Sequence, residues 1–473
     1  MTDITPTNVT RGACAFIEAS RFDNLPAEAI RIGRRCVLDG LALYVAGSDE
    51  ESVQVLIEDA REVGGKPEAL LLGGGEMKIP AALAARVLGT AGHAHDWDDT
   101  QVSRDPAHVY GLLTHPTVPP LTAALVMSQK LGSVSGRDFL NAFITGVEVE
   151  SKISEWMLPD HYKRGLHSSG TVGTFGACAA AAKLLGLTGT KLAHALGIAA
   201  SFAAGIRCNF GTMSKPLHVG RASENGVTAA LLAARGFTAD PEALDGRWGF
   251  MQVQGGGATA AKLEQGFGKT WSMVEPGISI KPYPSGIVTH QSMDAMLKLV
   301  TEKNVDPKKV ERIDFYAGSN ILNPIRYPIA QNHLQAKFSM AALLAMIVLK
   351  RQAGRQEFTN AFIQSEATQD MQRRINVHLD PEIEARGWDI IRSRIEITLK
   401  DGSKLTEWAN ERYRGGPDNP MSDKDLEGKV AACTAGLLDD KRREALIAAA
   451  YGVEKMADAG QLATIIQPQS SEA

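Results

Sequence analysis

The chain has 473 residues, carries a formal net charge of −4, and is 44% hydrophobic. This length predicts two or three structural units with sizeable cores, and the lack of lysine or arginine blocks argues against nucleic acid as a partner. The five cysteines form no CxxC pair, which is typical of reduced thiols. No apolar run reaches the roughly 18 residues that span a bilayer, and the first residues lack a signal-peptide pattern. We therefore expect a cytoplasmic protein with no membrane partner.

The first 274 residues are predicted to be almost entirely helical. Apolar residues recur at helical spacing from residue 26 to residue 46, and acids after Ser48 favour the start of a second helix. The glycines at 73–75 are not followed by GK[ST], so a plain turn is predicted instead of a phosphate-binding loop. Further helices are expected from Pro80, at residues 119–132 and 136–157, after His167 to about residue 186, at residues 188–205, and up to about Ala234.

Residues 90–116 bring many polar side chains into one stretch after an alanine-rich approach. If the helix continued through this stretch, Asp96 would share a face with Thr100, and His95 with Asp99. Carboxylates and imidazoles so close together are unsuitable for a core helix and suitable for a binding site. The titratable and hydroxyl groups of the stretch are His93, His95, Asp96, Asp98, Asp99, Thr100 and His115.

A metal centre is one alternative for this stretch, because His95 and the carboxylates are spaced like metal ligands. No HExxH signature and no second cluster completes a coordination shell, so the sequence favours a site without metal. A serine nucleophile is weakly supported too, since no GxSxG elbow is present.

A second polar cluster is predicted in residues 207–226, where glycine and proline punctuate a loop that leads into a helix. Its cations are suited to clamping a carboxylate, and a partly desolvated lysine such as Lys215 can donate or accept a proton. His167 is expected at the N-terminus of a small-residue helix, where free N–H groups attract an anion. His290 is expected to open a helix in the same way. The basic residues of the loop are Arg207, Lys215, His218 and Arg221.

The pattern changes near residue 275 to alternating apolar and polar residues rich in β-branched side chains, which predicts strands. Together with the intervening helices, this predicts a mainly α protein with an α+β part: a helical domain (1–274), a smaller α+β lid domain (275–409), and a C-terminal segment (410–473) that returns to the helical domain. Strands are expected within residues 275–286, 310–318, 375–380, 392–402 and 403–410, and helices at residues 290–302, 336–350, 423–437 and 441–451.

The motifs HDWDDT, THP, GLHSSGTVGTFGACAAA, FGTMSKPLHVG, KPYPSG with a following TH, and QAKFSM occur in this order. Together they resemble the MmgE/PrpD family, which includes 2-methylcitrate dehydratases, cis-aconitate decarboxylases and iminodisuccinate epimerases. The resemblance runs from about residue 30 to about residue 430. It implies a helical domain with an α+β lid, a homodimer, and a cleft that binds a small polycarboxylate without a metal or an organic cofactor.

The resemblance also implies which residues form the site. The matching positions are Asp96, Thr100, His115, His167, Lys215, His290 and Tyr327. Lys215, His167 and His290 would bind carboxylates and the developing charge. His115 would donate or accept the proton, and Asp96 would orient a cation or carry the proton itself. Where the family often has HPT, this chain has HSS at residues 167–169.

The family members leave the reaction open. A lyase, either a dehydratase or a decarboxylase, is the first hypothesis because lyases are the commoner members. A two-base epimerase of a substituted succinate is the alternative, in which Tyr162 and Lys215 would flank the stereocentre. Residues 101–114 resemble an insertion relative to the epimerases. A non-catalytic binding protein and a metal-dependent hydrolase are the hypotheses from other classes.

Overall fold

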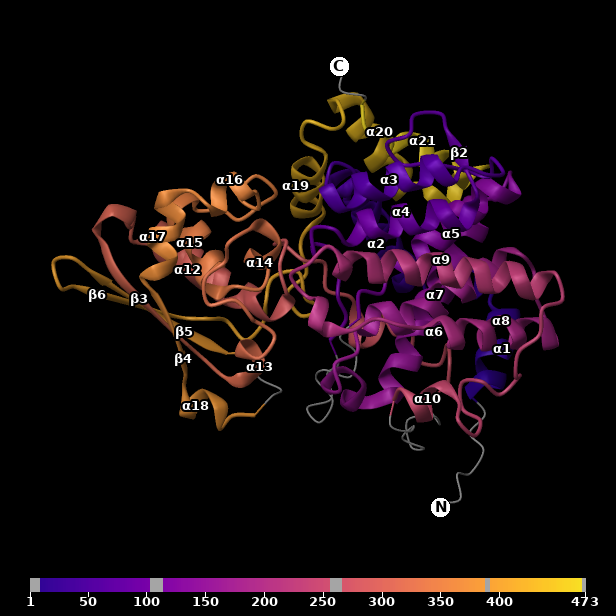
Figure 1. Cartoon of the computed structure of the whole chain (residues 1–473), viewed down its shortest axis with the longest axis horizontal. Helices are drawn as coiled ribbons and strands as arrows, with labels where there is room; N and C mark the ends of the chain where they lie inside the picture. Colours follow the sequence, from indigo (N-terminus) through magenta and orange to yellow (C-terminus); the bar gives the residue numbers. More distant parts are fainter. Residues whose placement is uncertain (1–8, 103–113, 256–265, 388–391, 470–473) are drawn as a thin grey trace.

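The computed structural model describes residues 9–102, 114–255, 266–387 and 392–469. Figure 1 shows a larger helical body beside a smaller body that contains the sheet. Each has its own hydrophobic core, and the core of the smaller body runs from Tyr283 to Ala409. The fold is therefore mainly α, with a helical domain and a smaller α+β domain, as the sequence predicted. No helix in the described ranges combines the length and apolar character that crossing a bilayer requires.

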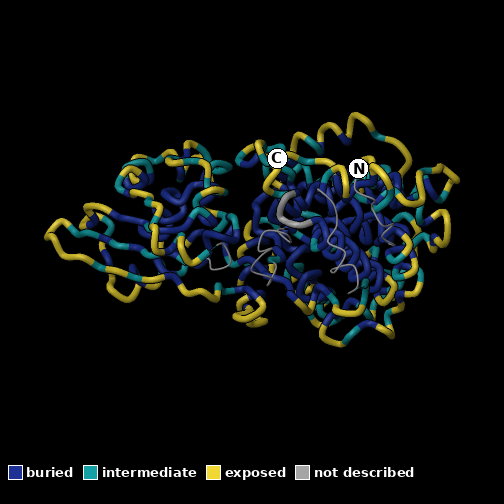
Figure 2. The backbone as a smooth tube through the Cα atoms, turned by 90° about the horizontal axis from the view of Figure 1, so that it is seen from below, coloured by how far each residue is buried: buried dark blue, intermediate teal, exposed yellow. Residues whose placement is uncertain are grey.

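The helical domain is a bundle around α7. Every residue from Ser168 to Ala182 of this helix is buried, and dark blue dominates the centre of the domain in Figure 2. Its small residues let neighbouring helices approach closely, because a Cβ at Gly226 of α9 would lie 2.5 Å from the Cβ of Ala177. The helices are α1 (Val9–Ala19), α2 (Ala27–Gly47), α3 (Glu51–Val63), α4 (Ala81–His93), α5 (Val118–Leu131), α6 (Gly136–Lys163), α7 (Ser168–Leu184), α8 (Gly189–Phe202), α9 (Ser214–Ala234) and α10 (Phe250–Val253), with a short hairpin of β1 (Ala69–Leu70) and β2 (Lys78–Ile79).

The C-terminal segment returns to the helical domain, where α19 and α20 contact α2. The yellow helices lie against the indigo ones in Figure 1. A buried ion pair marks this contact, with Nζ of Lys429 on α19 2.6 Å from Oδ1 of Asp39 on α2. The helices of the segment are α19 (Asp423–Thr434), α20 (Asp440–Tyr451) and α21 (Leu462–Ile465).

The α+β domain is built on one four-stranded sheet with the order β4-β3-β5-β6, in which only the β3–β4 pair is parallel. α12 contacts β5 and β6, and α15 contacts β4, so these two helices cover one face. The elements are α12 (His290–Glu302), β3 (Val310–Ala317), α13 (Ser319–Leu322), α14 (His333–Ala336), α15 (Met340–Lys350), α16 (Asn360–Ile363), α17 (Glu366–Arg373), β4 (Ile375–Leu379), α18 (Pro381–Glu384), β5 (Ser393–Leu399) and β6 (Lys404–Trp408).

The structure confirms four of the five expected strands as β3 to β6. The strand expected within residues 275–286 is wrong. A wide helical turn covers Met273–Gly277, and only an isolated bridge from Ser279 to Thr100 follows. Prolines at 276, 282 and 284 explain this, because each removes a backbone donor that a sheet would need.

Candidate active site

The polar stretch after α4 is not helical, so the expected pairing of Asp96 with Thr100 and of His95 with Asp99 on one helix face is wrong. α4 ends at His93, and Asp96 adopts a left-handed backbone conformation with φ of 53°. Aspartate tolerates this conformation better than most residues do. The backbone of Thr100 then pairs with that of Ser279. The amide nitrogen of each residue lies 2.8 Å from the carbonyl oxygen of the other. This backbone pairing connects the polar stretch after α4 to the start of the α+β domain.

Lysines from distant segments hold this turn through its backbone carbonyl groups. Lys337 donates to the carbonyl of Ala94 at 2.7 Å, Lys281 to that of Asp96 at 2.9 Å, and Lys429 to that of Trp97 at 2.8 Å. All three lysines are buried. The α+β domain and the C-terminal segment therefore both fix the position of the turn.

Two ammonium groups share one oxygen of Asp96. Nζ of Lys281 lies 2.7 Å from Oδ1 of Asp96, and Nζ of Lys215 lies 3.1 Å from the same atom. Burial alone would raise the pKa of Asp96, but Lys215 and Lys281 hold it well below its ordinary value. One negative charge between two positive charges leaves this group positive overall.

Six of the eight predicted site residues line one small cavity of about 60 Å³. They come from four separate stretches of the helical domain. The α+β domain closes the other side with Lys281, residues 286–288, Pro324, Ile325 and Phe338. The six predicted residues are Asp96, Thr100, His115, Tyr162, His167 and Lys215, and Phe210 lines the cavity beside them.

The imidazoles around the cavity are held in fixed orientations. Nδ1 of His115 lies 2.8 Å from the carbonyl oxygen of Asp99, and the amide of His115 donates to Oγ of Ser169 at 2.9 Å. The hydroxyl of Ser169, the last residue of the HSS motif, therefore anchors the backbone of His115. Nδ1 of His167 lies 3.0 Å from Nδ1 of His218, while its Nε2 atom is buried and has no hydrogen-bond partner among the residues that the structure describes.

Burial is the largest cause that lowers the pKa of His115 and of His167 well below the usual value, and the charge of Lys215 adds to it in both. These imidazoles are therefore neutral near pH 7. The positive charge at the cavity comes from the lysines, and the neutral rings supply lone pairs and N–H groups.

Tyr162 stands at the cavity wall under a guanidinium group. The Cζ atom of Arg207 lies 3.8 Å from the centre of the Tyr162 ring, and Nη1 of Arg207 donates to the carbonyl of Tyr162 at 2.9 Å. Burial raises the pKa of Tyr162 and Arg207 opposes this. Tyr162 therefore reaches the cavity as a phenol.

Two predicted substrate-binding residues do not line this cavity. His290 is buried in the α+β domain, where Nε2 lies 3.1 Å from the carbonyl of Ser285 and the ring packs edge-on against Tyr283. The hydroxyl of Tyr327 donates to the carbonyl of Phe210 at 3.2 Å. These contacts place both residues behind the cavity wall. The expected insertion at residues 101–114 falls mostly on residues 103–113, which lie outside the described part of the chain.

Residues 12–262 match the MmgE/PrpD N-terminal domain, and residues 283–452 match the MmgE/PrpD C-terminal domain. The chain belongs to the MmgE/PrpD family. Among similar proteins, cis-aconitate decarboxylase of Homo sapiens is 27% identical, with 98% of this chain and 95% of the relative covered. Cis-aconitate decarboxylase of Mus musculus is also 27% identical, with 98% and 94% covered. Cis-aconitate decarboxylase of Aspergillus terreus is 24% identical, with 97% and 96% covered.

Sequence reasoning missed several residues of this MmgE/PrpD site. Lys281 stands inside the KPYPSG motif, but its spacing gave no sign that it would reach Asp96. His93 and Asp98 were noticed only as members of the polar stretch, yet they form a buried pair with Nδ1 of His93 2.8 Å from Oδ2 of Asp98. Phe210 and Phe338 carry no polar signal, although both rings face Lys215.

Some donor atoms lie close enough together to hold a metal ion. Side-chain donors of His93, Asp96, Asp98 and His115 all lie within 4.8 Å of one another. Lys215, however, places its ammonium 2.8 Å from Nε2 of His93 and 3.1 Å from Oδ1 of Asp96. Lys215 therefore contacts two of these four donors, His93 and Asp96.

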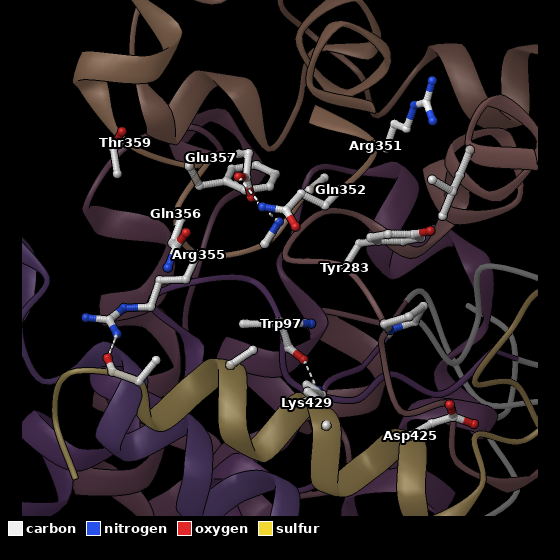
Figure 3. Close-up of a pocket in the computed structure, with 18 of the residues that line it drawn as sticks. Trp97, Tyr283, Arg351, Gln352, Arg355, Gln356, Glu357, Thr359, Asp425 and Lys429 are labelled. Atoms are coloured by element: carbon white, nitrogen blue, oxygen red, sulfur yellow. Dashed lines mark hydrogen bonds between the residues drawn. The ribbon is translucent and has the colours of Figure 1, made fainter. Parts of the chain in front are cut away.

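A larger cavity of about 770 Å³ lies elsewhere in the MmgE/PrpD chain, between the helical domain, the α+β domain and the C-terminal segment. Figure 3 shows Trp97 in this cavity, below Tyr283 and above the helix that carries Lys429. Of the eight predicted site residues, none lines it. Trp97 follows Asp96, and Pro282 follows Lys281, so the same two backbone segments contribute to both cavities.

Proposed function

We propose that this protein is a lyase that acts on a small polycarboxylate by acid–base chemistry next to a carboxylate, without a metal or an organic cofactor. The observation that carries the proposal is the sharing of one Asp96 oxygen by Lys215 and Lys281 at the wall of a small cavity. The surrounding imidazoles are neutral, so the two lysines that line the cavity outnumber Asp96, the one carboxylate that lines it with them. A ligand with several carboxylates would supply the missing negative charge.

Dehydration and decarboxylation of polycarboxylates share one electrostatic requirement. Both develop negative charge that a carboxylate or a conjugated system must absorb, and fixed cations in a site without bulk water stabilise that charge. Lys215 and Lys281 are the cations of the proposal, and the unpartnered Nε2 atom of His167 is a further group that can contact a carboxylate. Both lysines are held by the buried carboxylate of Asp96, so little reorganisation of these cations is needed during the reaction.

His115 is the proposed proton carrier. Its Nδ1–H is directed at the carbonyl of Asp99, which leaves the lone pair on Nε2. This atom lies 3.8 Å from Oδ1 of Asp96, on the side of the ring near the lysines. A neutral imidazole in this orientation can take a proton from a carbon or hydroxyl group and return it.

Cis-aconitate is the first substrate to test, because the similar human, mouse and fungal proteins are cis-aconitate decarboxylases and match the chain over nearly its whole length. In the proposed reaction the bond from carbon to one carboxylate breaks, carbon dioxide leaves, and the electron pair passes into the conjugated system. A proton then adds to carbon, so each turnover consumes one proton from solvent. Dehydration of 2-methylcitrate is the second reaction to test.

Epimerisation of a substituted succinate is a second candidate function. Tyr162 and Lys215 line the same cavity, which is the pairing that a two-base epimerase needs. One residue would remove the proton next to a carboxylate, and the other would return a proton from the opposite face.

One set of incubations separates these reactions. Purified protein is incubated with cis-aconitate, 2-methylcitrate and single enantiomers of substituted succinates in deuterated buffer, with and without EDTA. Carbon dioxide release identifies decarboxylation, a new alkene absorbance identifies dehydration, and deuterium uptake with racemisation identifies epimerisation. We expect carbon dioxide from cis-aconitate at the same rate in EDTA. Loss of activity in EDTA would contradict the cofactor-independent mechanism and favour a metal-dependent enzyme.

We also propose residues 275–409 as a lid on the helical domain, which comprises residues 1–274 and 410–473. The cavity has walls from both parts and a volume of only about 60 Å³, so a polycarboxylate must enter by a relative displacement of the two. The homodimer that the family resemblance implies and the cytoplasmic location expected from the sequence remain predictions. Light scattering of the purified chain tests the first, with twice the chain mass of 50.6 kDa as the expected value.

A further inference from the structure

His93 lies behind the cavity wall and connects two charged side chains. It is the last residue of α4, and its side chain is fully buried. Nδ1 of His93 lies 2.8 Å from Oδ2 of Asp98, and Nε2 of His93 lies 2.8 Å from Nζ of Lys215. The three side chains form a continuous hydrogen-bonded chain whose outer end, Lys215, lines the cavity.

The hydrogen bonds determine which nitrogen of His93 carries the proton. An ammonium group has only donors, so Nε2 of His93 must accept from Lys215. The single proton of the neutral ring then lies on Nδ1 and is donated to Asp98. Asp98 therefore holds His93 in the tautomer that presents a lone pair to Lys215, as the aspartate of a serine protease triad does for its histidine.

Apolar rings and titratable side chains surround the ammonium group of Lys215. The rings of Phe210 and Phe338 lie with their centres 5.2 Å and 5.5 Å from Nζ, so both exclude water from the ammonium. Burial is the largest cause that lowers the pKa of Lys215, and Asp96 opposes it. The titratable groups that surround Lys215 are His93, Asp96, Asp98, His115, His167, His218 and Lys281.

We propose that His93, oriented by Asp98, is a positioning residue for Lys215 that also exchanges a proton with it. Nε2 of His93 directs the ammonium into the cavity, and it accepts one proton from Lys215 when the reaction requires the free amine. This inference rests on the proposed function only for the part that Lys215 plays in turnover.

The exchange conserves charge within the buried group. One N–H bond of Lys215 breaks, its electron pair remains on Nζ, and a new N–H bond forms at Nε2 of His93. The ammonium becomes an amine and the imidazole becomes an imidazolium. Burial is the largest cause that lowers the pKa of His93, and it persists through the step. The repulsion by Lys215, which also lowers that pKa, disappears in the step, and the Asp98 carboxylate beside Nδ1 stabilises the new cation. Reversal of the step restores Lys215 as an acid.

His93→Gln separates positioning from proton exchange. The glutamine oxygen can accept from Lys215 near the place of Nε2, but an amide takes no proton at neutral pH. For His93→Gln we expect kcat for the proposed substrate to fall by about 100-fold, within the range for general acid–base groups, with KM changed by less than about threefold. His194→Gln is the matched control, because His194 is a half-buried histidine of the same domain outside the cluster. Melting temperatures identify variants that fail to fold.

Asp98→Asn tests the tautomer. An asparagine amide can donate to Nδ1, which would move the ring proton to Nε2 and direct an N–H at the ammonium. We therefore expect Asp98→Asn and His93→Ala to release Lys215 as the free amine at lower pH than in the wild type. Acetylation of Lys215 by acetic anhydride, followed across pH by mass spectrometry with the exposed Lys78 as internal reference, measures this without any substrate.

The two readouts distinguish this inference from the proposed function. If no substrate is turned over by the wild type, the acetylation curves alone decide. A shift of the Lys215 midpoint to lower pH by about one unit in His93→Ala and Asp98→Asn, with a smaller shift in His93→Gln, supports the inference. It is overturned if the His93→Ala curve superimposes on the wild-type curve, or if His93→Gln keeps kcat within about threefold of an active wild type.

Discussion

Oδ1 of Asp96 lies 2.7 Å from Nζ of Lys281, although the two residues are 185 positions apart in the sequence. The same oxygen lies 3.1 Å from Nζ of Lys215. A single carboxylate therefore joins the helical domain to the α+β domain and leaves an excess of positive charge at the cavity. Under the proposed function, we expect both the stability of the site and its affinity for an anion to depend on this arrangement.

Asp96→Asn should weaken both folding and function. Removing one partner of a buried ion pair leaves uncompensated charge, which typically costs about 3–5 kcal/mol of unfolding free energy. We expect a loss of this size in urea unfolding and a fall of at least about 100-fold in kcat/KM. Asp294→Asn is the control, because its carboxylate contacts Tyr283 and Arg414 outside the cavity. Equal losses of unfolding free energy and of kcat/KM in Asp96→Asn and Asp294→Asn would contradict the proposed role of Asp96 in the site.

Lys281→Met should reduce activity strongly, and it should reduce stability less than Asp96→Asn does, because Asp96 keeps Lys215 as a partner. Methionine keeps much of the length and apolar character of the lysine stem but removes the charge that contacts Asp96. Loss of one fixed donor to a developing oxyanion typically costs 100-fold to 1,000-fold in rate, so we expect kcat/KM to fall within about this range. The exposed Lys78→Met is the control. An unchanged kcat/KM for Lys281→Met would remove this lysine from the proposed site.

Tyr162→Phe separates the two candidate reactions. A lyase that uses His115 as its proton carrier needs the ring of Tyr162 only as part of the wall, so we expect kcat within about fivefold of the wild type. A two-base epimerase would lose its second proton carrier, and the rate of racemisation would then fall by a factor on the order of 100 to 10,000. Parallel assays of carbon dioxide release and deuterium uptake give the answer.

Removing only one partner of the buried ion pair between Lys429 and Asp39 should lower the unfolding free energy more than removing both partners does. Each group is buried, and Lys429 also donates to the carbonyl of Trp97. Lys429→Met alone should lower the unfolding free energy by about 3–5 kcal/mol, whereas the double change Lys429→Met with Asp39→Leu should be closer to the wild type. Urea unfolding of the single and double variants tests this. A double variant less stable than the single one would contradict it.

The stability of the helical domain should fall in mild acid because His161 is buried as a neutral ring. Burial lowers its pKa from 6.5 to about 4. Between these values the unfolded chain binds more protons than the folded chain, so stability is complete above about pH 6.5 and decreases toward pH 4. The decrease amounts to roughly 3 kcal/mol from this group. His161→Gln should flatten the plot of unfolding free energy against pH over this range, and an unchanged slope would refute the assignment.

Much of the fold could be predicted from periodicity and composition. The run of small residues after His167 predicts a central helix because only small side chains allow the close approach that α7 makes to α9. Alternation in the later part of the chain predicts β3 to β6 for the same local reason. The segment from 275 to 286 also alternates, but its prolines prevent pairing, and there the pattern gives the wrong element.

The candidate site was only partly accessible to such reasoning. Imidazoles, carboxylates and a lysine near glycine and proline indicated the correct stretches, and six of the predicted residues line the cavity. The left-handed conformation of Asp96 depends on lysines hundreds of residues away, so no local pattern could reveal it. Lys281 was missed because its partner Asp96 lies in the other domain, and His93 was missed because its partner Lys215 comes from a distant helix of the same domain.

Calorimetric titration with propane-1,2,3-tricarboxylate tests the central claim most directly, because this saturated tricarboxylate can bind but cannot be decarboxylated to the same product. We predict one binding site per chain in the wild type, with affinity reduced at least about tenfold, or by about 1.4 kcal/mol, in Lys215→Met and in Lys281→Met. Wild-type affinity in both variants, or no binding to the wild type at all, would contradict a polycarboxylate site between these two lysines.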